Sequence, residues 1–92
     1  MKMHTYMEVK GNNGIQRCYV ALEFDGMNLI LTKPKGFFRE KVAQIPLAEI
    51  GYLVQDEYFG AQRISFIHQN DYYQFYECGA SVIDYMKEQL FV

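Results

Sequence analysis

Apolar and polar side chains alternate along residues 17–24, and this period of two restricts the chain to a β-rich fold. The positions expected to face a core are Cys18, Val20, Leu22 and Phe24. Asp25 and Gly26 follow directly. An Asp-Gly pair between apolar runs is typical of a tight hairpin turn, because both central residues need a positive φ. Residues 27–32 are therefore predicted to return antiparallel to residues 17–24.

The remaining chain carries similar signals, and 30 of its 92 residues are of the types Val, Ile, Tyr, Phe or Thr, which favour pleated strands. The predicted strands are residues 6–10, 17–24, 27–32, 41–45, 50–56, 63–68 and 72–78. The predicted connections are turns at 11–14, 33–36 and 69–71, a bend at 46–49 and a loop at 56–62. The sequence thus predicts a mainly β fold with seven antiparallel strands.

The hydrophobic spacing changes after Gly79 and becomes helical. The apolar stripe, with a period of three to four residues, consists of Val82, Ile83, Met86 and Leu90. Ser81 lies three residues before Asp84, which predicts that its hydroxyl caps the first turn. A single amphipathic helix after a series of strands must pack on the sheet or close its open end.

Length and charge limit the class of protein. A chain of 92 residues makes one domain, residues 1–92. Its net charge of −2 provides no basic excess for holding nucleic acid. The longest stretch without a charged residue is seven residues, whereas a membrane helix needs about 20 apolar residues. No apolar segment precedes Glu8, so we expect no secretory signal and a cytoplasmic location.

No group of reactive side chains in the sequence resembles a catalytic or metal site. Cys18 and Cys78 are far apart in the sequence and lie outside any C-x-x-C pair, so we expect no metal and no cofactor, and we interpret both thiols as small buried apolar groups. His68, at the end of a predicted strand, is interpreted as a hydrogen-bonded structural residue. We therefore predict a protein that is not an enzyme.

The order of elements, seven antiparallel strands followed by one amphipathic helix, resembles the pleckstrin-homology (PH) superfold, and especially its GRAM-like and small bacterial PH-like relatives. Residues 45–50, with the sequence IPLAEI, resemble the I-P-L-x-x-I segment that such domains often carry between their two sheets. The resemblance implies a partly open barrel of two near-orthogonal sheets that is capped by the helix.

The resemblance also directs attention to the first hairpin, where phosphoinositide-binding PH domains carry a K-x(n)-K/R-x-R pattern. Here Lys10 and Arg17 flank the turn, but Tyr19 stands in the place of the last arginine. The turn itself, GNNG, is uncharged. This departure argues against specific binding of a lipid headgroup at the first hairpin.

Basic and aromatic residues concentrate in one predicted hairpin, residues 33–41. Its candidate membrane-binding or ligand-binding residues are Lys33, Lys35, Phe37, Phe38, Arg39 and Lys41. A basic loop with an aromatic tip attracts an anionic membrane and can insert its rings. The alternative is that the two phenylalanines fold back to close the barrel while the lysines stay solvated.

Tyrosines on predicted outward positions form the second candidate surface. If Tyr73 and Phe75 point into the core, then Tyr72 and Tyr76 point outward, and Tyr19 points outward on its own strand. Exposed tyrosines suit a protein interface because a rigid ring supplies contact area at a small entropy cost.

The sequence thus predicts a binding module of PH-like fold whose partner is another protein or a second copy of itself. Peripheral association with an anionic membrane through residues 33–41 is the first alternative. Binding of a small apolar ligand at the open end of the barrel is the second.

Overall fold

The computed structural model describes residues 2–79 and 81–91. Its elements, in chain order, are β1 (Lys2–Gly11), β2 (Gly14–Asp25), β3 (Asn28–Lys35), β4 (Phe38–Pro46), the 3-10 helix η1 (Leu47–Glu49), β5 (Gly51–Tyr58), β6 (Ala61–His68), β7 (Asp71–Tyr76) and α1 (Val82–Leu90). The predicted class, mainly β with one C-terminal helix, is confirmed. The predicted bend at residues 46–49 is η1.

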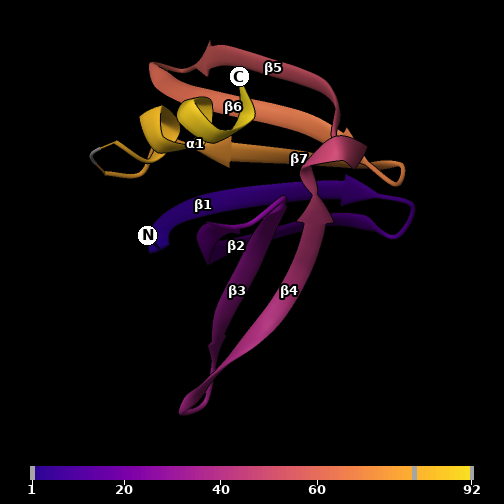
Figure 1. Ribbon diagram of the computed structural model, residues 1–92, viewed down its shortest axis with the longest axis vertical. Helices are drawn as coiled ribbons and strands as arrows, with labels where there is room; N and C mark the ends of the chain where they lie inside the picture. Colours follow the sequence, from indigo (N-terminus) through magenta and orange to yellow (C-terminus); the bar gives the residue numbers. More distant parts are fainter. Residues whose placement is uncertain (1, 80, 92) are drawn as a thin grey trace.

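All seven strands belong to one antiparallel sheet in the order β4-β3-β2-β1-β7-β6-β5. β1 lies between β2 and β7 and joins the two halves that the resemblance describes as two sheets. Figure 1 shows β3 and β4 running across the direction of β6 and β7, because the sheet bends strongly between its two ends. The edge strands β4 and β5 do not pair with each other, so the barrel stays open.

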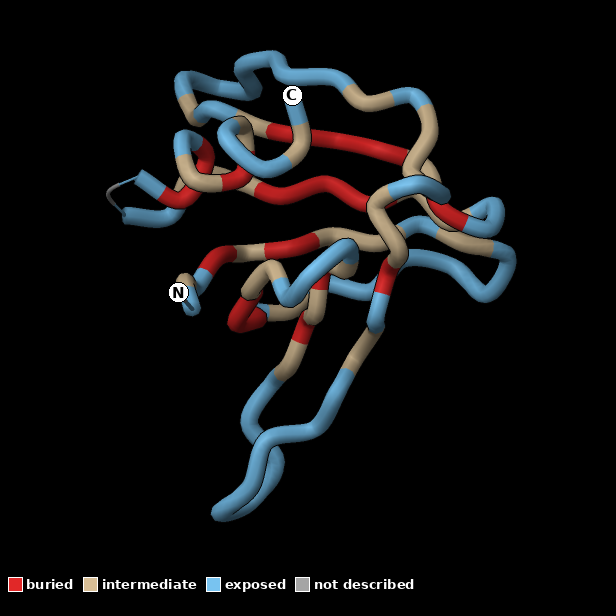
Figure 2. Tube along the Cα trace, in the orientation of Figure 1, coloured by how far each residue is buried: buried red, intermediate tan, exposed pale blue. Residues whose placement is uncertain are grey.

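The core lies between the inner face of the sheet and α1. Helix residues Val82, Ile83 and Met86 are buried, and they belong to the same apolar cluster as Met7 and Phe75 of the central strands. Figure 2 shows this buried material along β6, β7 and β1, beside the helix. In the described part of the chain, no helix has the length and apolar character that crossing a bilayer requires.

The turn predicted at residues 33–36 is wrong, because β3 continues through Pro34 to Lys35. The chain reverses instead at Gly36 and Phe37, and Gly36 takes the positive φ of 61° that the first central position of a type II′ turn needs. Pro34 is tolerated because this hairpin lies at the edge of the sheet. Arg39 strengthens it by donating to Thr32 Oγ1 (3.0 Å) and to the Thr32 carbonyl (3.2 Å).

The loop predicted at residues 56–62 is also wrong, since β5 and β6 continue through it to a turn at Phe59 and Gly60. Polar side chains hold these strand ends together, with two hydrogen bonds from Arg63 to Asp56 at 2.7 and 2.9 Å. The last strand is shorter than predicted and ends at Tyr76. Cys78 therefore lies in the connection to α1 and is exposed, contrary to the expected buried thiol.

Ser81 precedes α1 as predicted, but it makes no side-chain capping bond, because its backbone has a φ of 75°. Glu77 supplies the missing acceptor. Its Oε1 atom accepts from the backbone N–H of Val82 at 3.1 Å and of Ile83 at 3.5 Å. A carboxylate at this end also stabilises the positive end of the helix dipole.

Candidate functional site

The basic and aromatic residues predicted from the sequence lie on a hairpin that projects from the body. We call residues 33–41 the arm. Figure 1 shows β3 and β4 extending together to its tip, and Figure 2 shows the tip as exposed. The side chains of Phe37 and Phe38 are 103% and 81% exposed. The two rings therefore do not fold back to close the barrel.

Most of the charged side chains on the arm are positive. Strand pairing places Lys33 opposite Glu40 and Lys35 opposite Phe38, so these four side chains share one face of the hairpin. Among the described residues, no carboxylate lies within ion-pair distance of Lys33, Lys35, Arg39 or Lys41. Four cations and one acid give the arm a charge of +3, and because the whole chain carries −2, the rest of it carries −5.

A second candidate surface lies on the outer face of the sheet, opposite α1. Tyr6 of β1 pairs in register with Tyr19 of β2 on one side and with Tyr76 of β7 on the other. The ring centroids are 5.3 Å apart for Tyr6 and Tyr19 and 5.6 Å apart for Tyr6 and Tyr76. The structure thus brings Tyr19 and Tyr76 onto one face, linked by Tyr6, which the sequence analysis did not select.

The row continues onto β6 and β5. Arg63 pairs with Tyr76, and its guanidinium lies 4.6 Å from the centroid of Tyr58 and 5.8 Å from that of Tyr76. Tyr58 in turn contacts Phe59 edge-on at 4.5 Å. We call these aromatic residues the tyrosine surface: Tyr6, Tyr19, Tyr58, Phe59 and Tyr76. Tyr72 is not part of it, because it lies further along β7 beneath Lys10, whose ammonium is 5.9 Å from its ring.

Glu8 organises the middle of the tyrosine surface. It accepts hydrogen bonds from the hydroxyls of Tyr76 (3.1 Å) and Tyr6 (3.2 Å) and from Arg17 Nε (3.2 Å). Desolvation raises the pKa of the Glu8 carboxyl, but these three donors together hold that pKa below its ordinary value. Desolvation is also the largest cause that raises the pKa of Tyr6 and of Tyr76, and Glu8 adds to it.

Folding stability is expected to fall in acid partly through Glu8. Because its pKa is lower in the folded than in the unfolded chain, its contribution is complete above the ordinary value of 4.5 and is lost as the pH falls through the folded value. Glu8→Gln should therefore flatten the decline in urea midpoint between about pH 5 and pH 3. An equally steep decline in this variant, measured by urea unfolding, would show that Glu8 contributes nothing.

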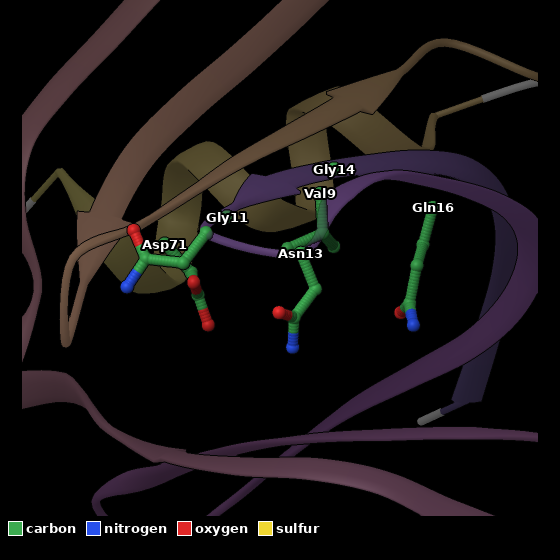
Figure 3. A pocket seen from close by; sticks show the side chains of 7 residues that line it. Val9, Gly11, Asn13, Gly14, Gln16 and Asp71 are labelled. Carbon is green, nitrogen blue, oxygen red and sulfur yellow. The ribbon is translucent and has the colours of Figure 1, made fainter.

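The first hairpin borders a pocket of about 270 Å³ whose lining residues do not suit a phosphate group. It is lined by Val9, Gly11, Asn12, Asn13, Gly14, Gln16 and Asp71. Figure 3 shows amide and carboxylate side chains pointing into it. No basic residue lines it, and a phosphate would meet the charge of Asp71.

A second pocket, of about 300 Å³, is mostly apolar and lies between η1, the start of β5 and the end of α1. Leu47, Ile50, Leu53 and Leu90 line it, together with Met27, Ala48 and Gln89. It lies beside the helix that packs against the open sheet. The small apolar ligand expected at the open end of the barrel remains a prediction.

The described residues contain no group of three or more His, Cys, Asp or Glu side chains that could hold a metal ion. His68 is buried, and its Nε2 lies 2.9 Å from Glu49 Oε1. The prediction that His68 is hydrogen-bonded is therefore confirmed.

Comparison with known proteins supports the fold. No protein-family model and no curated protein sequence matches the chain. A solved structure of Vav1, described as inhibited by an allosteric inhibitor that blocks its GEF activity, is similar over 96% of this chain, with a TM-score of 0.66 and 10% identity. The chain spans 25% of that Vav1 chain. Vav1 contains a PH domain, and the likeness shows that the present chain has a PH-like fold.

Proposed function

We propose that this chain is a non-enzymatic binding module that attaches to an anionic membrane surface through the arm. The observation that carries the proposal is the exposure of Phe37 and Phe38 at the tip of a projecting hairpin with a charge of +3. Large apolar side chains that are exposed side by side on a protein surface commonly mark a site of contact with a membrane or another molecule. A lipid surface offers both an apolar interior for the rings and anions for the lysines.

The energies are sufficient for reversible attachment. Each cation near an anionic surface contributes about 1 kcal/mol. Burial of a phenylalanine side chain contributes about 1.5–3 kcal/mol more. The remaining chain, at −5, is repelled by the same surface. This charge separation orients the molecule with the arm toward the membrane and the body away from it.

The arm recognises charge density and not one headgroup. A stereospecific phosphate site needs a pocket with converging basic donors, whereas the pocket at the first hairpin has amides and one carboxylate.

A cytoplasmic location belongs to the proposal, because the cytoplasmic leaflet carries a negative surface potential. The closer relationship to GRAM-like domains that the sequence suggests is also part of it.

Sedimentation with lipid vesicles tests the proposal. The protein should pellet with vesicles that contain phosphatidylserine, stay in solution with phosphatidylcholine alone, and be released by raising the salt concentration. Phe37→Ser combined with Phe38→Ser should weaken binding by at least about a hundredfold, because two rings that each contribute about 1.5–3 kcal/mol lose their burial. Equal pelleting with both lipids, or no pelleting with either, would contradict the proposal.

A further inference from the structure

We infer that the pocket at the first hairpin is a binding site for a guanidinium group. The pocket lies on the inner face of the sheet, because Val9 follows the buried Met7 by two residues and pairs with Gln16 on β2. Asp71, at the start of β7, lines the same pocket. The site is separate from the arm and from the tyrosine surface, so the proposed attachment to a membrane does not depend on it.

Asp71 gives the pocket a negative charge that has no counter-ion within the part of the chain that the structure describes. Its side chain is half-buried and forms no ion pair there. Lys10 lies next to Val9 in the sequence but points to the outer face, where its ammonium is 5.9 Å from the centroid of the Tyr72 ring. An unpaired carboxylate attracts a cation and repels an anion. The charge of the pocket therefore favours a positively charged ligand.

The amide side chains around Asp71 add further hydrogen-bond acceptors. Figure 3 shows Asn13, Gln16 and Asp71 reaching into the pocket. None of these three side chains makes a hydrogen bond to another of the described residues, so their oxygen atoms are free to accept from a ligand. The ligand that suits them is a cation with several N–H donors.

A guanidinium group matches both the charge and the size of the pocket. It carries its N–H donors in one plane and bonds a carboxylate through two of them, which leaves the others for the amide oxygens. The volume of about 270 Å³ is far larger than the space of about 10–15 Å³ that a single water molecule needs. A bare metal ion would leave most of this pocket unfilled, whereas a planar organic cation occupies more of it.

Gly11 leaves the space in which the Asp71 carboxylate lies. A Cβ atom at position 11 would come within 2.4 Å of Asp71 Oδ1 and within 3.3 Å of its Cγ. These contacts are too short, so an alanine at this position would displace the carboxylate while its charge stays in the chain. Gly11→Ala therefore separates the placement of the carboxylate from its charge.

Titration with three small probes, followed by the NMR signals of the backbone amides, tests the inference. n-Butylguanidinium should shift the signals of residues 9–16 and 71, and the shifts should saturate. n-Butylurea has nearly the same shape without the charge, and tetramethylammonium has the charge without an N–H donor, so both should bind at least about tenfold more weakly. Shifts that do not saturate, or equal binding of either comparison probe, would overturn the inference.

The variants show whether Asp71 holds the probe. Asp71→Asn should weaken binding of n-butylguanidinium by about tenfold to a hundredfold, because it removes a charge-assisted hydrogen bond. Gly11→Ala should weaken it as well. The matched control is Asp25→Asn, which removes the same charge at an exposed position beside the turn between β2 and β3 and should bind like the wild type.

The amide spectra also establish that each variant is folded. Folded Asp71→Asn or folded Gly11→Ala protein that binds as tightly as Asp25→Asn protein would overturn the inference. The guanidinium can come from a small molecule or from an arginine side chain of a peptide, and the peptide acetyl-Gly-Arg-Gly-amide distinguishes these sources. Tighter binding of the peptide than of n-butylguanidinium would assign the site to an arginine side chain, and weaker binding would assign it to a small molecule.

Discussion

Lys33→Glu combined with Lys35→Glu is expected to abolish binding to anionic vesicles. The change removes two attractions and adds two repulsions, which together weaken binding by about 4 kcal/mol, or on the order of a thousandfold. Both lysines are exposed on the arm and have no ion-pair partner among the described residues, so the fold should be unaffected. Vesicle sedimentation at low salt measures the loss directly.

The control is Lys2→Glu combined with Lys87→Glu, which changes the net charge of the chain by the same amount at sites away from the arm. It should reduce vesicle binding far less than the arm variant. If the two double variants lose binding equally, net charge and not the position of the arm determines attachment.

Phe75→Ala is expected to have the largest effect on folding. Its side chain is fully buried on β7, the strand that joins β1 to β6, and its ring lies 5.6 Å from that of Phe66. Truncation of a buried phenylalanine costs about 3–5 kcal/mol, which is a large part of the stability of a domain of this size. Urea unfolding followed by circular dichroism gives the change in the free energy of unfolding.

Met27→Ala is the matched control, since the Met27 side chain is 71% exposed in the turn between β2 and β3. The free energy of unfolding should change by less than about 0.5 kcal/mol. A Phe75→Ala variant as stable as this control would contradict the position of β7 at the centre of the core.

The strands and the helix could be predicted from the sequence because the alternation and spacing of apolar residues that indicate them are local. The alternation along residues 17–24 predicted that Val20 and Leu22 are buried, and both are. The helical stripe after Gly79 likewise predicted burial of Val82, Ile83, Met86 and Leu90. The first three are buried, and Leu90 is partly buried against the same core. Strand ends were less predictable, because cross-strand bonds extend β5 and β6 through a segment whose composition is typical of a loop.

The candidate surfaces depended on information that is not local. Tyr6 and Tyr76 are 70 positions apart, and only the pairing of β1 with β7 places them side by side. Tyr58 and Phe59 fell in a predicted loop, so the position of Tyr58 on β5 and of Phe59 in the turn after it was missed. Alternation along β5 would have indicated Tyr58, because Tyr58 lies two residues after Asp56 and therefore points to the same face of the strand. The composition of the arm was visible in the sequence, whereas its projection from the body was not.

The emission of a single tryptophan tests the central claim most directly, because the chain contains no tryptophan of its own. Phe37→Trp places the reporter at the tip of the arm, and Phe59→Trp places a matched reporter at the exposed turn between β5 and β6. With phosphatidylserine vesicles, the emission at position 37 should shift to the blue and be quenched by quenchers attached to lipid chains, while the emission at position 59 should be the same with and without vesicles. Binding that leaves the emission at position 37 unchanged would contradict insertion of the arm.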